Sequence, residues 1–190
     1  MRRQLVPALV VFLFFTALVG VVYPLAVTGV ARIAFPSKSQ GSLVRRGDMV
    51  VGSRLLGQAF SGPRYFQPRP SAAGTGYDGA ASGASNLGPA DPLLLAEVRA
   101  RVAAYRRLNN LAASTPVPVD AVTASGSGLD PEISPANARL QAPRVARIRG
   151  LPLAHVLALV RENTNGRSLG FLGEPGVNVL ELNLALNELK

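Results

Sequence analysis

Two serines, one aspartate and a single histidine are the side chains of this sequence that nucleophilic catalysis would use. Ser125, Ser127 and Asp130 lie in the segment VTASGSGLDPEISPANA, and His155 follows in LPLAHVLALV. A serine nucleophile needs a neighbouring base, and the hydrolase elbow has the pattern G-x-S-x-G. Ser127 instead has a glycine directly on each side. We therefore expect no catalytic residue, with a membrane-anchored serine hydrolase that uses Ser127 and His155 as the alternative.

The same segment lacks the patterns that hold nucleotides or metal ions. A phosphate-binding loop needs G-x-x-x-x-G-K-[ST], but the lysines of this chain are Lys38 and Lys190, and Gly126 and Gly128 lack the third glycine of a dinucleotide fingerprint. One histidine and no cysteine argue against zinc, and the two carboxylates of DPE are too few for calcium. We expect no metal and no cofactor bound by a recognisable motif, and we interpret Asp130 as a buried carboxylate that locks a turn.

A long apolar run precedes these residues. No charged residue occurs from Leu5 to Ala31, and a membrane-spanning helix needs about 20 such residues. The apolar part of a signal peptide has only about 7–15 residues, so we favour a permanent helix, with a secreted ligand-binding module as the alternative. Pro24 either kinks this helix or marks its far end. Thr16, Ala17 and Gly20 are small enough to let partner helices approach closely.

The net charge of +9 comes almost entirely from arginine. A nucleic-acid-binding surface concentrates basic residues and interleaves them with aromatic ones. Here the arginines are scattered and aromatic residues make up 6% of the chain. We therefore expect no nucleic-acid partner, and we assign some arginines to anionic lipid headgroups and others to an acidic partner. Basic residues flank both ends of the apolar run, so charge alone does not give its orientation.

An α+β architecture is predicted, with one N-terminal transmembrane helix followed by a small mixed α/β domain. Residues 1–33 would form a short N-terminal end and the membrane helix, and residues 34–190 the domain. One or two short strands are expected in residues 47–60. Residues 61–92 are rich in glycine and proline but contain aromatic residues that a free linker does not need. We expect this segment to be ordered but irregular.

Local capping signals predict the helices of the domain. Asp91 and Pro92 are typical of a helix start, and the expected apolar face of that helix consists of Leu94, Val98, Val102, Tyr105 and Leu108. Residues 116–128 predict a strand that leads into a turn. Ser134 and Pro135 predict a second helix that runs to about Ile148, before Gly150 stops it.

Two further segments complete the predicted domain. A third helix is expected over residues 152–163. Residues 177–189 alternate like a strand but also fit a helix capped by Asn178, and we favour the helix.

Several blocks in a fixed order carry a resemblance to a known family. They are GSLV, GDMVVGSRLLGQAF, YFQPRPSA, SGASNLGPADP, VTASGSGLDPEISPANA, QAPRVAR and VNVLELNLALN. Together with the single apolar helix, they resemble the C subunit of the bacterial Kdp-type potassium-transporting ATPase, over nearly the whole chain.

The resemblance implies a single-pass protein of the bacterial inner membrane with a periplasmic C-terminal domain. Its partners would be a channel-like potassium-binding subunit, a P-type ATPase subunit and a small membrane peptide. The complex would handle ATP and potassium. In that family this subunit is described as a stabilising, catalytic-chaperone-like component that raises the affinity of the pump for ATP.

Aromatic, arginine and proline residues are common anchors of protein interfaces. On that basis we expect partner contacts from one set of residues, with the alternative that they only build the domain's own loops. The set is Tyr65, Phe66, Arg69, Pro70, Asn86, Leu87, Ser125, Gly128, Asp130 and Pro135.

Overall fold

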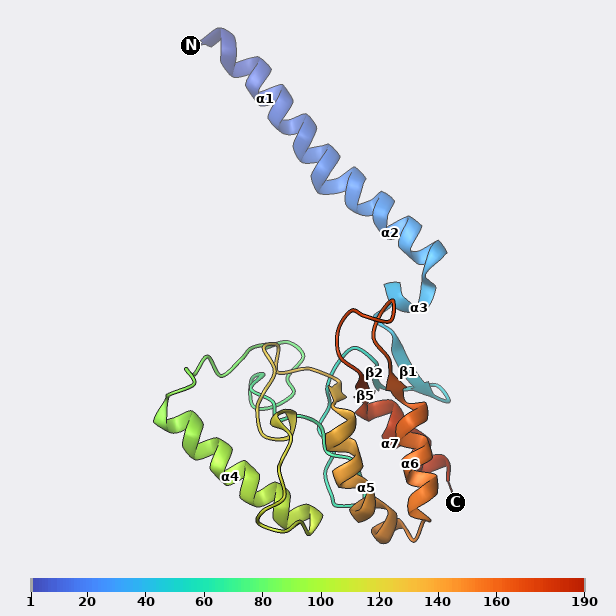
Figure 1. The fold of residues 1–190 in the computed structure, drawn as a ribbon. Helices are drawn as coiled ribbons and strands as arrows, with labels where there is room; N and C mark the ends of the chain where they lie inside the picture. The colour runs from blue at the N-terminus through green and yellow to red at the C-terminus, as the bar shows by residue number, and fades with distance from the viewer. Residues whose placement is uncertain (1, 190) are drawn as a thin grey trace.

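A continuous N-terminal helix stands away from the rest of the chain (Figure 1). The computed structural model describes residues 2–189, so Met1 and Lys190, the outer ends of the predicted ranges 1–33 and 34–190, lie outside the described residues. The helix consists of α1 (Arg2–Ala17), a π-helical turn (Leu18–Val22) and α2 (Tyr23–Ala34). Residues Arg3–Ala34 are long and apolar enough to cross a membrane.

Pro24 explains the π-helical turn. Its ring clashes with the carbonyl group four residues earlier, and one wider turn directly before the proline relieves that clash. The helix then continues to Ala34. The alternative that Pro24 marks the far end of the helix is therefore wrong.

A short helix and a hairpin connect the membrane helix to the domain. α3 (Pro36–Ser39) is followed by β1 (Leu43–Arg46) and β2 (Met49–Ser53), which pair antiparallel. Residues 54–91 contain neither helix nor strand, yet Phe66 within them is fully buried. The irregular segment is thus part of the packed domain.

Helix α4 (Pro92–Asn109) begins as its capping residues predict. The Asp91 carboxylate accepts a hydrogen bond from Leu93 N at 2.8 Å, and Asn110 ends the helix in the left-handed conformation. The expected face is partly wrong, since Leu108 is 39% exposed whereas Asn109 is buried. The side chain of Asn109 faces the rest of the domain instead, where its Oδ1 accepts from Arg144 Nε at 2.9 Å, and its Nδ2 donates to Tyr105 O in the preceding turn of α4.

The strand predicted over residues 116–128 is wrong. This segment forms one 3₁₀ turn (Val119–Ala121) and then irregular turns. Pro116 and Pro118 lack the backbone N–H that a strand ladder needs. The strand of this region lies further along, as β3 (Glu132–Ile133).

Three helices and a small sheet make the rest of the domain. α5 (Pro135–Arg149) starts at the Ser134 cap, whose Oγ accepts from Asn137 N, and ends at Gly150, as predicted. α6 (Leu153–Glu162) and α7 (Val179–Glu188) confirm the other two predicted helices. The Asn178 side chain accepts from Glu181 N and so caps α7.

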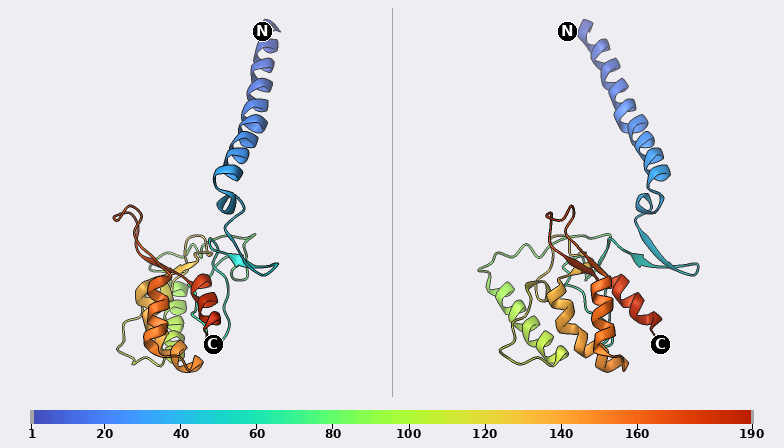
Figure 2. Two further views of the ribbon diagram at one scale, coloured as in Figure 1. Left: turned by 90° about the vertical axis from the view of Figure 1, so that its right-hand side faces the viewer. Right: turned by 45° about the vertical axis from the view of Figure 1, so that its right-hand side comes forward.

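The sheet has the order β3–β5–β4 and is antiparallel throughout. β4 is Thr164–Asn165 and β5 is Gly176–Asn178, with Val177 opposite both Ile133 and Thr164. Figure 2 shows α5, α6 and α7 side by side below this sheet. The core lies between them, and it consists of Phe66, Ile133, Ala138, Ala142, Val145, Ala146, Val156, Val160, Val177, Val179, Leu182 and Leu186.

Candidate functional site

The side chains that catalysis would need are bonded within the local fold. Ser127 Oγ accepts from Leu129 N at 3.1 Å, and Ser125 Oγ lies 3.4 Å from Ser127 Oγ. His155 is exposed on α6. Within residues 2–189, no hydrogen bond joins this imidazole to a serine, and no cluster of three or more His, Cys, Asp or Glu residues could hold a metal ion. The geometry therefore gives no positive support to the serine hydrolase alternative.

Asp130 locks its turn, as the sequence predicts, although it is half-buried rather than buried. Its Oδ1 accepts from Glu132 N at 3.0 Å, and its Oδ2 pairs with Arg69 Nη1 at 2.8 Å. Arg69 also donates to the carbonyl oxygen of Ala124 at 3.3 Å. Two residues predicted to contact partners, Arg69 and Asp130, are thus joined to each other across two separate loops.

Close backbone approaches hold the same loops together. Gly83 N donates to Ser127 O at 2.9 Å, and Gly57 N donates to Leu129 O at 2.7 Å. Gly128 has a φ of +68°, and a Cβ placed on it would lie 2.6 Å from both Ala73 N and Gly83 O. A side chain at this position would collide with backbone, so the turn requires glycine.

A buried polar network fixes residues 63–67 on the helices. The Asn183 side chain bonds both backbone groups of Phe66, accepting from its N at 2.9 Å and donating to its O at 3.0 Å. Gln141 bonds Gln67 in the same way, at 2.7 and 3.0 Å. Both amide side chains are fully buried. The irregular segment thus borrows side-chain partners from α5 and α7 in place of a strand neighbour.

Arg144 is the charged member of this network and is almost fully buried. It donates to the carbonyl oxygens of Pro63 and Tyr65, to Asn109 Oδ1 at 2.9 Å and to Gln141 Oε1 at 2.8 Å. Burial lowers the pKa of its guanidinium to about 10, so it remains charged at neutral pH. Its positive charge is stabilised by oriented carbonyl dipoles, because no ion pair with a carboxylate involves it within residues 2–189.

Asp120 joins this network to the start of α5. Its carboxylate accepts from Ser134 N, Ser134 Oγ and Asn137 Nδ2, all within 2.9 Å. Asn137 Oδ1 in turn accepts from Tyr105 Oη at 2.8 Å. Burial, together with the charge of Asp120, raises the pKa of Tyr105 above its usual range. Through these bonds α4, α5 and the 3₁₀ turn form one rigid unit.

The predicted contact residues differ in how far a partner could reach them. Tyr65 is half-buried, with the Arg149 guanidinium 5.0 Å from its ring centre, whereas Phe66 is 0% exposed and packs in the core. Asn86 is exposed, and Gly128 is buried. The remainder are half-buried, namely Arg69, Pro70, Leu87, Ser125, Asp130 and Pro135.

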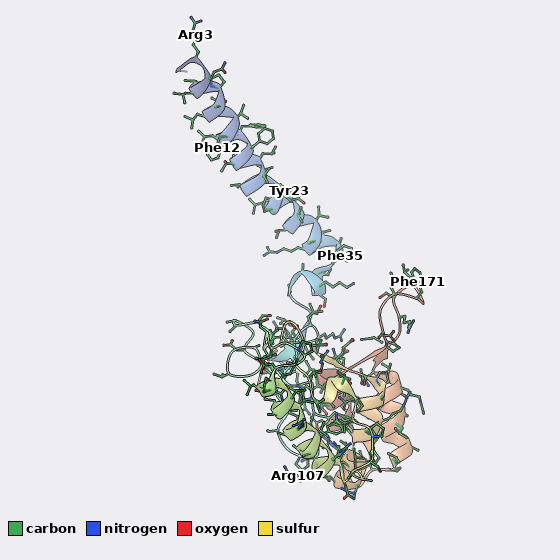
Figure 3. The ribbon with its side chains drawn as sticks, turned by 60° about the vertical axis from the view of Figure 1, so that its left-hand side comes forward. Arg3, Phe12, Tyr23, Phe35, Arg107 and Phe171 are labelled. Atoms are coloured by element: carbon green, nitrogen blue, oxygen red, sulfur yellow. The ribbon has the colours of Figure 1, made fainter. Side chains whose placement is uncertain are left out.

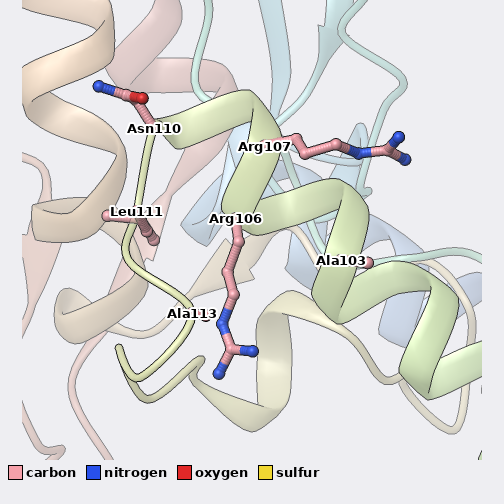
Figure 4. Close-up of a pocket in the computed structure, with 6 residues that line it drawn as sticks. All are labelled: Ala103, Arg106, Arg107, Asn110, Leu111 and Ala113. Carbon is pink, nitrogen blue, oxygen red and sulfur yellow. The ribbon is translucent and has the colours of Figure 1, made fainter.

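A shallow hollow at the end of α4 offers a basic surface (Figure 4). It has a volume of about 510 Å³ and is lined by Ala103, Arg106, Arg107, Asn110, Leu111 and Ala113. Arg106 donates to Thr115 O through Nε and Nη2, at 3.2 and 2.8 Å. Arg107 is exposed and points away from Arg106. The two arginines that line this hollow suit an acidic group better than a neutral one.

The membrane helix presents its small residues openly. Thr16 Oγ1 donates to Phe12 O at 2.8 Å, which satisfies the hydroxyl within the helix. A Cβ placed on Gly20 would meet no atom within 4 Å. Thr16 and Gly20 are four residues apart and so lie on one face, although Gly20 falls in the π-helical turn.

A family model described as KdpC, the c chain of the K+-transporting ATPase, matches residues 5–188. The chain belongs to the KdpC family. It is 58% identical over 189 residues to the potassium-transporting ATPase KdpC subunit of Mycobacterium tuberculosis, with 100% of both chains covered. The KdpC subunits of Rhodospirillum rubrum and Beijerinckia indica are 57% and 54% identical, and the alignments cover 99% and 98% of this chain and 97% and 94% of theirs.

Membership of the KdpC family confirms the resemblance drawn from the sequence blocks. The chain is a component of the potassium-transporting ATPase complex, and its partners are other Kdp subunits. One apolar helix and one compact domain fit a single-pass protein of the inner membrane.

Sequence reasoning overlooked the polar network as a feature of the site. Asn137, Gln141 and Arg144 are spaced by four and three residues and so share one face of α5. That face also carries Ala138 and Val145, both fully buried. Polar residues on an apolar helix face are the signal that could have revealed buried hydrogen bonds.

Proposed function

We propose that this KdpC family member is a non-catalytic accessory subunit that stabilises the assembled complex and raises the affinity of the ATPase subunit for ATP. Its partners are a channel-like potassium-binding subunit, the P-type ATPase subunit and a small membrane peptide. ATP and potassium are handled by the complex. The chain acts by favouring one conformational state of its partners, which is how a subunit without chemistry of its own changes an affinity.

The observation that carries this proposal is the contrast between the helix and the domain. No residue of the Arg3–Ala34 helix is buried, so its side chains are free to meet lipid and partner helices. The domain, by comparison, bonds its candidate nucleophiles and carboxylates to itself, with Ser127 and Asp130 as the clearest cases. Such a molecule is suited to holding other subunits rather than to turning over a substrate.

The domain is proposed to lie in the periplasm. Long domains that follow a membrane helix are translocated largely regardless of flanking charge. ATP is then on the other side of the membrane, and the effect on its affinity passes through the membrane helix. A tenfold change in ATP affinity corresponds to about 1.4 kcal/mol, which a few helix contacts that differ between two states can supply.

The half-saturating ATP concentration of the potassium-stimulated ATPase tests the effect on affinity. The complex is compared before and after selective removal of this chain, and again after the purified full chain is added back. We expect the half-saturating concentration to rise on removal and to return on addition. An unchanged value in a complex that stays assembled would refute the proposed effect.

Cysteine labelling tests the orientation, because the chain contains no cysteine. Ser85→Cys places a thiol on an exposed loop of the domain, and Gln4→Cys places one at the exposed start of the helix. In intact spheroplasts, a membrane-impermeant maleimide should label Ser85→Cys and spare Gln4→Cys. Labelling in the reverse pattern would place the domain in the cytoplasm.

A further inference from the structure

The hairpin between β4 and β5 ends in an apolar tip, defined here as residues 168–173. Leu169 is 83% exposed, Phe171 is 67% exposed and Leu172 is 50% exposed. These are three of the large apolar side chains in the domain, and none of them packs on the core. The two sides of the hairpin are fixed below the tip, because β4 and β5 belong to the three-stranded sheet.

Four of the six backbone N–H groups of the tip donate within the hairpin. Ser168 N donates to Leu172 O and Leu172 N donates to Ser168 O, both at 2.9 Å, and Gly170 N and Phe171 N donate to Arg167 O and Ser168 O. Unsatisfied backbone groups are the main obstacle to placing irregular structure against lipid. Because these four N–H groups are already bonded, moving the tip out of water costs less than it would for an unbonded loop.

Leu169 occupies a backbone conformation that favours glycine. Its φ is +54°, which costs a residue with a Cβ roughly 1 kcal/mol or more. Glycine follows directly as Gly170, yet a leucine occupies this position and is the most exposed of the three apolar side chains of the tip. The strained backbone thus presents an apolar side chain to the surroundings.

The charges at the base of the tip cancel. Arg167 Nη2 donates to both carboxylate oxygens of Glu174, at 2.8 and 2.9 Å. Residues 168–173 contain no charged side chain. The tip therefore presents neither a net charge nor a charged side chain that a polar protein surface would recognise.

The tip projects on the side of the domain from which the membrane helix leaves. Figures 1 and 2 show the hairpin reaching beyond the other loops of the domain in that direction, to about the level of α3. Figure 3 shows Phe171 at its end, on the same side as Phe35. Phe35, 58% exposed at the end of the membrane helix, marks the level where aromatic side chains meet the lipid headgroups.

We propose that Leu169, Phe171 and Leu172 insert into the lipid interface and give the domain a second contact with the membrane. The helix and the hairpin then hold the domain at two points, which restricts its rotation about the short link of α3. Four features of the tip together favour lipid as the material that it contacts. The tip is apolar, four of its six backbone N–H groups are bonded within the hairpin, the charges at its base cancel, and it lies at the membrane end of the domain.

The full chain tests this directly because it contains no tryptophan. Phe171→Trp makes the tip the only tryptophan in the chain, which is then reconstituted into phosphatidylcholine vesicles with and without brominated acyl chains. We expect emission shifted to shorter wavelength and a loss of intensity in the brominated lipid. The two faces of such a vesicle are equivalent, so the result does not depend on the periplasmic orientation or on any effect on ATP affinity.

Ile148→Trp is the matched control. Ile148 is 45% exposed in the last turn of α5, and Figure 1 shows the end of α5 on the side of the domain away from the membrane helix. Its tryptophan should show no quenching by brominated lipid. Adding Leu169→Asp to Phe171→Trp should abolish the quenching at the tip, because a charge must then leave water.

Equal quenching of Phe171→Trp and Ile148→Trp would overturn the proposal. So would a tip tryptophan that lipid does not quench but whose emission shifts when the full complex assembles, since the occupant would then be a protein subunit. A tip tryptophan that is not quenched by lipid and does not change its emission when the complex assembles would also overturn it, because the apolar side chains would then stay in water.

Discussion

Replacing Asn183 with alanine removes the bonds that hold the irregular segment on α7. Asn183 is 0% exposed and bonds both the N and the O of Phe66. The variant leaves two buried backbone groups without partners, and each such group costs about 1–3 kcal/mol. Water that enters the vacated space will satisfy these two groups in part. We therefore expect the free energy of unfolding to fall by about 3 kcal/mol, in the lower half of the combined cost of the two groups.

The thermal midpoint of the full chain in detergent, followed by near-ultraviolet circular dichroism, measures this loss. About 3 kcal/mol corresponds to a fall of about 6–12 °C for a domain of this size. Trypsin should also cut faster after Arg64, which lies at the start of the released segment. Because Tyr65, Arg69 and Pro70 lie on that segment, recovery of the chain in the complex should fall as well.

Asn187→Ala is the matched control on the same helix. Asn187 is half-buried, and its Oδ1 accepts from Arg149 Nη2 at 2.9 Å. This single, partly exposed bond is expected to contribute about 1 kcal/mol or less. If Asn183→Ala lowered the midpoint no more than Asn187→Ala, the polar network would not be what fixes the segment.

Four further predictions follow from the same structure. Gly128→Ala should lower the free energy of unfolding by about 2–4 kcal/mol, seen as a fall in the thermal midpoint, because its Cβ would lie 2.6 Å from two backbone atoms. Gly126→Ala, with no atom within 4 Å, should leave the midpoint unchanged, and equal effects would contradict the loop packing. Burial raises the pKa of Tyr77 from 10.0 to about 12, so this residue contributes stability that is present below pH 10.0 and is lost as pH rises through about 12. The thermal midpoint of Tyr77→Phe should therefore fall less steeply with pH over that window than the midpoint of the unchanged chain, and equal dependence on pH would contradict the raised pKa of Tyr77. Gly20→Leu should reduce co-purification of the tagged chain with its partners, because a large side chain keeps partner helices apart, while Val19→Leu should leave it intact. Equal recovery of the two variants would show that partner helices do not pack on the face that contains Gly20. His155→Ala should leave assembly and potassium-stimulated ATPase activity unchanged, whereas a loss of hydrolysis by the chain would favour the hydrolase alternative.

The helices were predictable because their signals are local. Asp91, Ser134 and Asn178 each cap the helix that directly follows them, so the caps can be recognised within a few residues. The apolar run of the membrane helix is also a local property. The strand expected over residues 116–128 was wrong because Pro116 and Pro118 lack the N–H groups of a strand ladder, although the side chains around them are β-prone.

The site was less predictable because its bonds join distant residues. Gln141 contacts Gln67, which is 74 residues away, and Asn183 contacts Phe66 at a separation of 117. Sequence composition marked Phe66 as an interface anchor, yet its ring fills the core. An aromatic residue suits either environment, and only the packing of α5 and α7 decides between them.

Labelling of the assembled complex with a photoreactive ATP analogue shows whether this chain binds nucleotide itself or acts only through its partners. After illumination the subunits are separated, and the label on each is measured with and without competing ATP. We expect label on the ATPase subunit, and no label on this chain that ATP displaces. Label on this chain that micromolar ATP displaces would show that it binds nucleotide itself, and would contradict a non-catalytic subunit that acts through assembly.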